Sequence, residues 1–286
     1  MTAAPNEQAV IFDCAGEQLV GIVSGAENGG GIGLLILVGG PQYRAGSHRQ
    51  YVLLARRLSH FGVPVMRFDY RGMGDSGGEM LSFEHVVPDI SAAVEAFRTA
   101  APSVERIVLW GLCDAASEAL LYWHATHDER VAGLVLADPW ITSHEEFAKS
   151  QLRHYVQRPF QREFWTKLFN GGIDVTGALR DFAAVLMKTR DGASAPPTAI
   201  EMSFQEKMTR GMDSFRSPVL LLLSGDLTAR DFIGHCETHP QWQRLIDRAN
   251  VERGEVPDAN HTFATAAARL RVENLTIDWL KRGFGI

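Results

Sequence analysis

The segment Ile107-Val-Leu-Trp-Gly-Leu-Cys-Asp-Ala-Ala-Ser117 decides the fold of this chain. Its short apolar run at residues 107–110 predicts a buried strand, and a helical pattern follows over about 116–127. Between them stands Cys113, with a glycine two positions before it and an alanine two positions after it. Small flanking residues let a strand and a helix close around a strained turn that exposes one side chain. We therefore expect Cys113 to project from such a turn.

This pattern has the form Gly-x-Ser-x-Gly, with cysteine in the position of the serine nucleophile and alanine in that of the second glycine. A thiol at a helix N-terminus lies where the helix dipole favours the thiolate, which is the reactive form. We expect Cys113 to be a nucleophile. The alternative is a cysteine that serves only as a small buried apolar side chain.

Short apolar runs alternate with helical patterns along most of the chain, which is typical of a mostly parallel, twisted sheet with helices on both faces. This rhythm predicts an α/β fold with about eight strands. An opening hairpin is expected at residues 10–12 and 19–23. The further expected strands are 32–38, 63–68, 107–110, 134–137, 219–224 and 251–256, and the expected helices are 49–61, 86–100, 116–127 and 263–281.

One long stretch interrupts this rhythm. Between Asp138 and Pro218 no apolar run predicts a strand. An insertion of this length suggests a helical lid or cap over a cleft at residues 140–213, with the α/β core formed by residues 1–139 and 214–286. The alternative is a helical excursion packed on the surface, without a gating role.

The composition excludes several classes of protein. The chain has 286 residues, 45% of them hydrophobic and 22% charged, with a net charge of -6 and no basic stripe, so nucleic acid is not an expected partner. The three cysteines are far apart in sequence and suggest neither a metal site nor a disulfide framework. No cofactor is expected. A reducing compartment fits this cysteine usage.

The N-terminal residues lack the basic and apolar regions of a signal peptide, and the longest apolar runs are too short to span a bilayer. We therefore expect a cytoplasmic protein with no integral membrane segment. The sequence does not fix the oligomeric state, and a homodimer stays open.

A cysteine nucleophile requires a base, and the base requires an orienting acid. His261 is the expected base, because it lies in the loop between the strand 251–256 and the last helix. Asp226, just after the strand 219–224, is the expected acid. Asp231 is its main rival, and Asp138, after an earlier strand, is another position for the acid.

The oxyanion of an acyl-transfer intermediate requires two backbone donors. The N–H of Asp114, directly after the nucleophile, is one expected donor. The other should come from the loop after the strand 32–38, which reads Gly39-Gly-Pro-Gln42. Proline has no N–H, so Gly40 is expected before Gln42. The alternative is that these glycines form an ordinary turn.

The segment Gln42-Tyr-Arg-Ala-Gly-Ser-His-Arg49 is expected at the rim of the cleft. Its arginines could bind an anionic part of a substrate, since a guanidinium holds a carboxylate or phosphate through two hydrogen bonds. Structural ion pairs are the alternative, and for Arg71 we expect such pairs, with acids such as Asp69 and Asp75. The expected substrate-binding residues are Gln42, Arg44, His48 and Arg49.

The segment Asp69-Tyr-Arg-Gly-Met-Gly-Asp-Ser76 resembles the Asp-x-Arg-Gly-x-Gly-x-Ser turn of α/β hydrolases. Together with the turn at Cys113 and with His261, this resemblance covers nearly the whole chain and implies the α/β-hydrolase fold. The cysteine is also similar to that of dienelactone hydrolase, which uses Cys, His and Asp on this fold.

More narrowly, four segments look like the exosortase A system-associated hydrolase type 1 family. That resemblance implies an association with exopolysaccharide and protein-sorting systems but no particular substrate. The segments are residues 38–50, 67–76, 110–115 and 224–229.

These features predict a hydrolase that acts on an ester, thioester or lactone of small size, with Cys113, His261 and Asp226 forming a triad that works through an acyl-enzyme. An acyltransferase with the same triad is one alternative. A binding or scaffold module that keeps the fold without catalysis is another. Redox sensing at Cys113 would require Cys14 or Cys236 to approach it in space.

Overall fold

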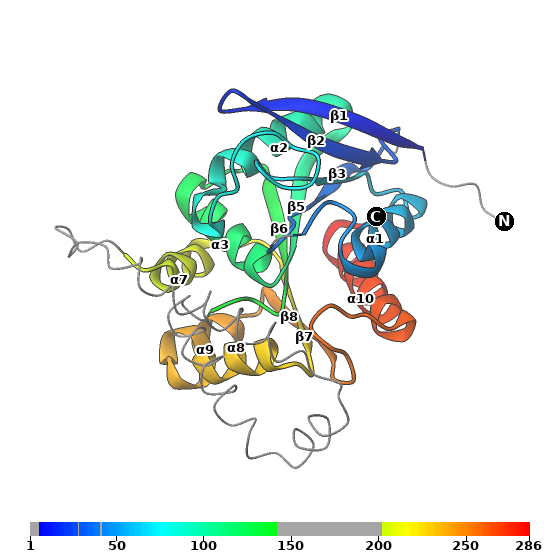
Figure 1. Ribbon diagram of the computed structural model, residues 1–286. Helices are drawn as coiled ribbons and strands as arrows, with labels where there is room; N and C mark the ends of the chain where they lie inside the picture. The colour runs from blue at the N-terminus through cyan, green and yellow to red at the C-terminus, as the bar shows by residue number, and fades with distance from the viewer. Residues whose placement is uncertain (1–5, 28, 41, 142–201) are drawn as a thin grey trace, which may run out of the picture. The chain divides into compact units, whose positions relative to one another are not determined.

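The computed structural model describes residues 6–27, 29–40, 42–141 and 202–286, and these ranges hold the whole α/β core (Figure 1). Its centre is one sheet of eight strands in the order β1-β2-β4-β3-β5-β6-β7-β8. The strands are β1 (Glu7–Cys14), β2 (Glu17–Ser24), β3 (Gly31–Ile36), β4 (Val65–Phe68), β5 (Val104–Leu112), β6 (Val131–Ala137), β7 (Val219–Ser224) and β8 (Val251–Val256).

The pairing of the strands confirms the predicted architecture. β1 and β2 form the opening antiparallel hairpin, β2 also pairs antiparallel with β4, and all other pairs are parallel. Every residue of β4, β6 and β7 is buried. Helices cover both faces of the sheet, so β6 and β7 appear in the sequence as nearly continuous apolar runs without alternation, whereas β4 includes the buried Arg67.

Two groups of helices cover the two faces of the sheet (Figure 1). α1 (Gln50–His60) and α10 (Ala266–Phe284) pack together on one face. α2 (Val87–Ala100) and α3 (Asp114–Thr126) pack together on the other. All four were expected from the sequence, with ends that differ by a few residues.

The sequence patterns missed three helices, α7 (Phe204–Ser214), α8 (Leu227–Thr238) and α9 (Pro240–Ile246). α7 carries a signal that could have revealed it. The Ser203 side chain accepts a hydrogen bond from the N–H of Glu206, and the Glu206 side chain accepts one from the N–H of Ser203. This reciprocal cap marks the start of a helix in sequence as well as in structure.

The predicted lid at residues 140–213 lies mostly outside the described residues, because nothing is described between 142 and 201. At its end, α7 packs against α3 and belongs to the same compact unit as the sheet. The core therefore resumes at Ser203, about ten residues earlier than the sequence patterns suggested.

The sheet and a helix approach each other closely where β5 turns into α3. A Cβ atom placed on Gly111 would lie 2.3 Å from the carbonyl oxygen of Ala115, a distance that backbone atoms do not tolerate. Glycine is therefore required here, since only the absence of a side chain lets the helix start directly against the strand.

We predict that Gly111→Ala lowers the free energy of unfolding by about 1–3 kcal/mol or more, because the methyl group must displace backbone. Gly234→Ala is the matched control. Gly234 lies inside α8, and a Cβ atom placed on it would meet nothing within 4 Å. There, alanine should stabilise the protein by up to about 1 kcal/mol. Urea unfolding followed by tryptophan fluorescence measures both, and equal effects of the two substitutions would contradict the prediction.

Candidate active site

Cys113 stands at the sharp turn between β5 and α3. Its φ of 65° and ψ of -126° form a backbone conformation that residues other than glycine rarely adopt. Hydrogen bonds fix the turn: the Cys113 N–H donates to Ala137 O at 2.9 Å, and Cys113 O accepts from Trp140 N–H at 3.1 Å. The thiol-bearing residue is only partly buried.

The adjacent strand β6 ends in a second strained residue. Asp138 has a φ of 41° and is fully buried. Its carboxylate accepts hydrogen bonds from the N–H of Ser224 at 2.8 Å and from the Ser224 hydroxyl at 2.6 Å. The same carboxylate faces Nδ1 of His261 at 3.3 Å. A buried, fixed acid thus orients a half-buried imidazole.

The acid beside the imidazole is therefore Asp138, and the expectation of Asp226 is corrected. Asp226 begins α8, and its N–H donates to the Ser224 hydroxyl at 3.1 Å. Asp231 is exposed further along that helix. Among the described residues, neither makes a hydrogen bond with His261. The residues after β7 support Asp138 through Ser224 instead of supplying the acid themselves.

The expectation that the helix dipole favours a thiolate is also corrected. Burial raises the pKa of the Cys113 thiol well above its ordinary value, and the negative charge of Asp114 raises this pKa further. The charges of Asp138 and Glu118 act in the same direction, while the N–H of Asp114 offsets only part of the effect. The resting side chain is a neutral thiol, so a base must take its proton during any nucleophilic attack.

The Asp114 carboxylate also accepts a hydrogen bond from one of the expected oxyanion donors, the N–H of Gly40. Its Oδ2 accepts a hydrogen bond from the Gly40 N–H at 2.8 Å, and its Oδ1 accepts one from the Ala115 N–H at 3.1 Å. The N–H of Gln42, the second choice of donor, binds Gly40 O at 2.8 Å. Neither expected donor of this loop is open to a substrate in the conformation described.

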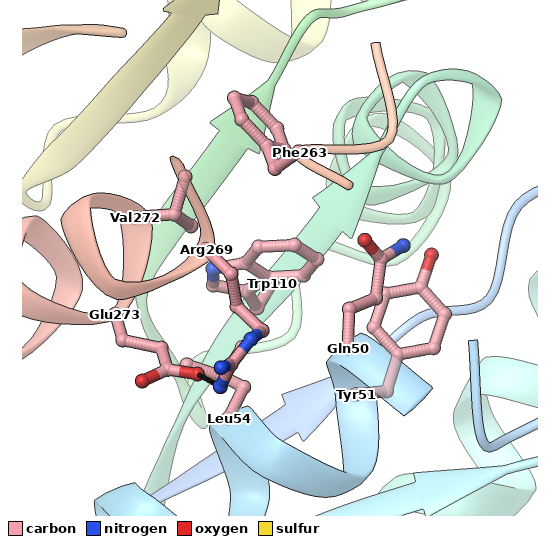
Figure 2. A pocket seen from close by; sticks show the side chains of 8 residues that line it. All are labelled: Gln50, Tyr51, Leu54, Trp110, Phe263, Arg269, Val272 and Glu273. Carbon is pink, nitrogen blue, oxygen red and sulfur yellow. Dashed lines mark hydrogen bonds and ion pairs between the residues drawn. The ribbon is translucent and has the colours of Figure 1, made fainter. Parts of the chain in front are cut away.

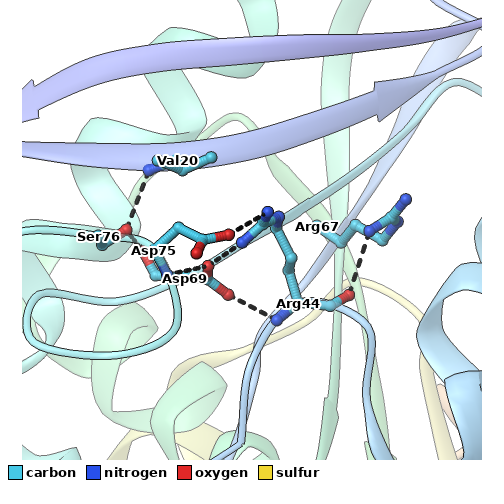
Figure 3. A network of polar contacts seen from close by, with 6 residues as sticks. All are labelled: Val20, Arg44, Arg67, Asp69, Asp75 and Ser76. Atoms are coloured by element: carbon cyan, nitrogen blue, oxygen red, sulfur yellow. Dashed lines mark hydrogen bonds and ion pairs between the residues drawn. The ribbon is translucent and has the colours of Figure 1, made fainter.

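Within the rim segment, Arg44 is held by ion pairs and is not open to an anion (Figure 3). The Arg44 guanidinium binds the buried carboxylate of Asp69 and also Asp75, the latter at 2.6 Å. The Arg44 N–H donates to Asp69 Oδ1 at 2.6 Å. The proposed anion-binding role of Arg44 is therefore replaced by a structural one: it fastens the loop after β3 to the turn after β4.

The other rim residues differ in whether their side chains form hydrogen bonds or ion pairs. Gln42 accepts hydrogen bonds from the N–H and hydroxyl of Ser47, at 3.2 and 3.3 Å. His48 and Arg49 are exposed, and their side chains make no hydrogen bond or ion pair with the described residues. These two stay candidates for contact with a substrate. Both have positive φ, 53° and 61°.

The Asp-x-Arg-Gly-x-Gly-x-Ser motif forms the turn after β4, and the hydrogen bonds of this turn give the motif a structural role. Ser76 donates to Asp69 O at 2.7 Å and accepts from Val20 N–H at 2.9 Å (Figure 3). Arg71 forms a structural ion pair as expected, but with Asp89 at 2.7 Å rather than with the acids of its own turn. The motif therefore serves to build the loops around the site.

A cavity lies between α1, β5 and α10, beside the loop that carries His261 (Figure 2). Three of the polar atoms in its wall, Gln50 Nε2, Tyr51 Oη and Trp110 Nε1, are buried without a well-formed hydrogen bond to the described residues. Burial raises the pKa of Tyr51, so its hydroxyl keeps its proton. The wall can therefore donate hydrogen bonds to an oxygen-bearing group. The lining residues are Gln50, Tyr51, Leu54, Trp110, Phe263, Arg269, Val272 and Glu273.

The described residues offer neither a metal site nor a membrane span. No cluster of His, Cys, Asp and Glu in these ranges could hold a metal ion. In the same part of the chain, no helix is long and apolar enough to cross a membrane.

A family model matches most of the chain. The model of the Hydrolase_4 family, described as serine aminopeptidase S33, matches residues 43–263. The chain belongs to this family. The match includes the turn between β5 and α3; the family description names a serine enzyme, whereas this chain has Cys113 at that turn. No curated protein matches the chain.

Solved structures share the fold of this Hydrolase_4 member. The esterase Pf2001 of Pyrococcus furiosus superposes with a TM-score of 0.71 at 17% identity, over 98% of this chain and 92% of that one. Est1E of Butyrivibrio proteoclasticus, solved with ferulic acid bound, gives 0.62 at 14% identity, over 97% and 100%. XC6422 of Xanthomonas campestris, a serine hydrolase without a lid, gives 0.58 at 15% identity, over 98% and 96%. At these identities the likeness shows the α/β-hydrolase fold alone.

We predict that Asp138→Asn lowers kcat for an activated ester by about 10²- to 10⁴-fold, because an amide cannot hold the imidazole in the tautomer that accepts a proton. The matched control is Asp226→Asn, which removes the same charge from the residue expected from sequence. It should stay within about threefold of wild type, since Asp226 makes no hydrogen bond or ion pair with His261 among the described residues. A large loss in Asp226→Asn with none in Asp138→Asn would contradict this assignment.

We further predict that alkylation of Cys113 by iodoacetamide is slow at neutral pH. The alkylation rate should increase about tenfold per pH unit. It should continue to increase beyond pH 9.0, which is the ordinary pKa of a cysteine thiol. The reason is that alkylation follows the thiolate fraction. Peptide-resolved mass spectrometry measures the rate, with N-acetylcysteine as the reference. A plateau below about pH 8 would show a thiolate at rest.

Proposed function

We propose that this chain is a cysteine-nucleophile hydrolase of the esterase or thioesterase type, using Cys113, His261 and Asp138. The observation that carries the proposal is that Cys113 follows β5 in a strained conformation, next to β6, and that the acid directly after β6, Asp138, binds the His261 imidazole at 3.3 Å. The presence of an esterase among the similar solved structures supports the choice of an ester. Lactones fall within the same chemistry.

The resting thiol defines the first step. His261 takes the proton from Cys113 as the sulfur attacks the carbonyl carbon, which places the negative charge on the carbonyl oxygen. The resulting imidazolium then gives this proton to the departing alcohol or thiol. A carbon–sulfur bond has formed, the substrate's ester or thioester bond has broken, and the acyl group is held as a thioester on Cys113.

Asp138 acts through His261. It accepts from Nδ1, so that Nε2 is the nitrogen free to exchange protons with sulfur and leaving group. The second half of the reaction repeats the first with water in place of the thiol. His261 takes a proton from water, the hydroxide adds to the acyl carbon, and the carbon–sulfur bond breaks with return of the proton to sulfur.

Two alternatives use the same residues differently. An acyltransferase would replace water by an alcohol or thiol acceptor in the second half of the reaction. Two observations favour a binding or scaffold module without catalysis. The raised pKa of Cys113 keeps the nucleophile protonated, and the hydrogen bond from Gly40 to Asp114 occupies an oxyanion donor. An association with exopolysaccharide and protein-sorting systems in the cytoplasm stays a proposal that follows from the sequence resemblance.

We predict that wild-type protein forms an acyl adduct on Cys113 within minutes of exposure to p-nitrophenyl esters or acyl thioesters, whereas Cys113→Ala forms none and loses at least about 10³-fold in turnover. Intact-protein mass spectrometry measures the adduct, and product release measures the turnover.

Cys113→Ser is the second variant, because it fills the same space. It should fold like wild type and react much more slowly, since the hydroxyl is a far weaker acid than the thiol. Equal turnover in wild type and Cys113→Ala would disprove the mechanism. Adducts that disappear only when an alcohol or thiol acceptor is added would assign the chain as an acyltransferase.

A further inference from the structure

We propose that the Asp114 side chain gates the oxyanion hole: it binds the Gly40 N–H in place of the substrate oxyanion and must release this donor before Cys113 can be acylated. The inference rests on the proposed function, because the oxyanion arises only in acyl transfer. It assigns to the residue after the nucleophile a side-chain role in addition to its backbone role.

The contact between Asp114 and the opposite loop is direct. Oδ2 accepts from Gly40 at 2.8 Å, and Oδ1 accepts from the N–H of Ala115 at 3.1 Å. A Cβ atom placed on Gly39 would lie 2.0 Å from Oδ1 of Asp114 and 2.7 Å from Leu112 O. The carboxylate therefore fills the space between the loop after β3 and the first turn of α3, and glycine at position 39 makes this space available.

This position conflicts with acyl transfer. The oxyanion would lie beside Cys113 and requires the N–H groups of residues 40 and 114. With the Asp114 carboxylate in place, the Gly40 N–H is already bound. The negative charge of the oxyanion would also form next to the negative charge of Asp114. Loss of one such donor alone costs about 10²- to 10³-fold in rate.

The surroundings of Asp114 favour its uncharged form. On α3 it is flanked by Cys113 and by Glu118, whose carboxylate accepts from the Tyr70 hydroxyl at 2.6 Å. The charge of Asp114 also raises the pKa of Tyr51 on α1, and Asp138, directly after β6, raises the pKa of Cys113. His261 acts in the opposite direction and lowers the pKa of Asp114.

Burial raises the pKa of Asp114, and the hydrogen bonds from Gly40 and Ala115 offset part of this. The neutral fraction of a group with a raised pKa is high below that pKa and falls as the pH increases through it. The gate is therefore expected to be open at lower pH and increasingly closed at higher pH. A neutral carboxyl accepts from Gly40 more weakly and adds no charge beside the oxyanion.

The test compares acylation of Cys113 by p-nitrophenyl acetate in wild type, Asp114→Asn and Asp114→Ala, using intact-protein mass spectrometry between about pH 4 and about pH 9. Iodoacetamide alkylation of Cys113 is measured in parallel, because it depends on the thiolate but requires no oxyanion hole. The ratio of the two rates removes the change in thiol ionisation that accompanies loss of the Asp114 charge. Asp231→Asn, an exposed carboxylate on α8, controls for the loss of one charge.

We expect the acylation-to-alkylation ratio to increase at least about tenfold in Asp114→Ala and less in Asp114→Asn, whose amide oxygen can still accept from Gly40. The advantage of both variants over wild type should grow with pH and then level off, while Asp231→Asn follows wild type. An unchanged or lower ratio in both Asp114 variants would overturn the gate and make Asp114 a support of the loop. Alkylation without acylation in every variant would also overturn it. Acylation of the protein that persists in Cys113→Ala would instead identify another nucleophile and overturn the proposed function, and the gate with it, whereas an unchanged ratio overturns the gate and leaves the proposed function standing.

Discussion

Two neighbouring parallel strands that both end in strained residues hold the site together. Cys113 follows β5 with a φ of 65°, and Asp138 follows β6 with a φ of 41°. Each such conformation costs of order 1–3 kcal/mol, and the sheet supplies the hydrogen bonds that maintain it. The Cys113 N–H binds Ala137 O, directly before Asp138, so the nucleophile and the acid are fixed by the same ladder. His261 lies in the loop after β8 and contacts this pair of residues through the acid: its Nδ1 lies 3.3 Å from the Asp138 carboxylate.

The electrostatic character of the site is negative. Asp114, Glu118 and Asp138 all raise the pKa of Cys113, and no cation offsets them among the residues found to act on the thiol. A cysteine activated as a resting thiolate requires a positive environment. This arrangement instead keeps the thiol neutral until a base takes its proton, so that charge forms on sulfur only as it attacks. The mechanism thus resembles that of a serine enzyme more than that of a low-pKa cysteine enzyme.

Hydrophobic patterning predicted all eight strands, most clearly β3, β6 and β7, which are buried on both faces and read as nearly uninterrupted apolar runs. The chain order of nucleophile, acid and histidine fits Asp138 as well as Asp226, so order alone could not choose between them. The choice depends on Ser224, whose hydroxyl and N–H both turn toward Asp138. The partners of Arg44 and Asp114 lie 25 and 74 residues away in sequence, and no local pattern identifies such pairs.

The loop after β3 is held at both of its ends. Asp114 binds its Gly40 N–H, and Asp69 binds Arg44 through both the backbone N–H and the guanidinium. Asp69 is fully buried and also accepts from the N–H of Asp75 at 3.0 Å, so its position is fixed by its own turn. Withdrawing the loop from α3 would require breaking this buried ion pair, which is costly. Turning or protonating one side chain, Asp114, is the smaller change, and this difference in cost is why the gate is assigned to the carboxylate and not to the loop.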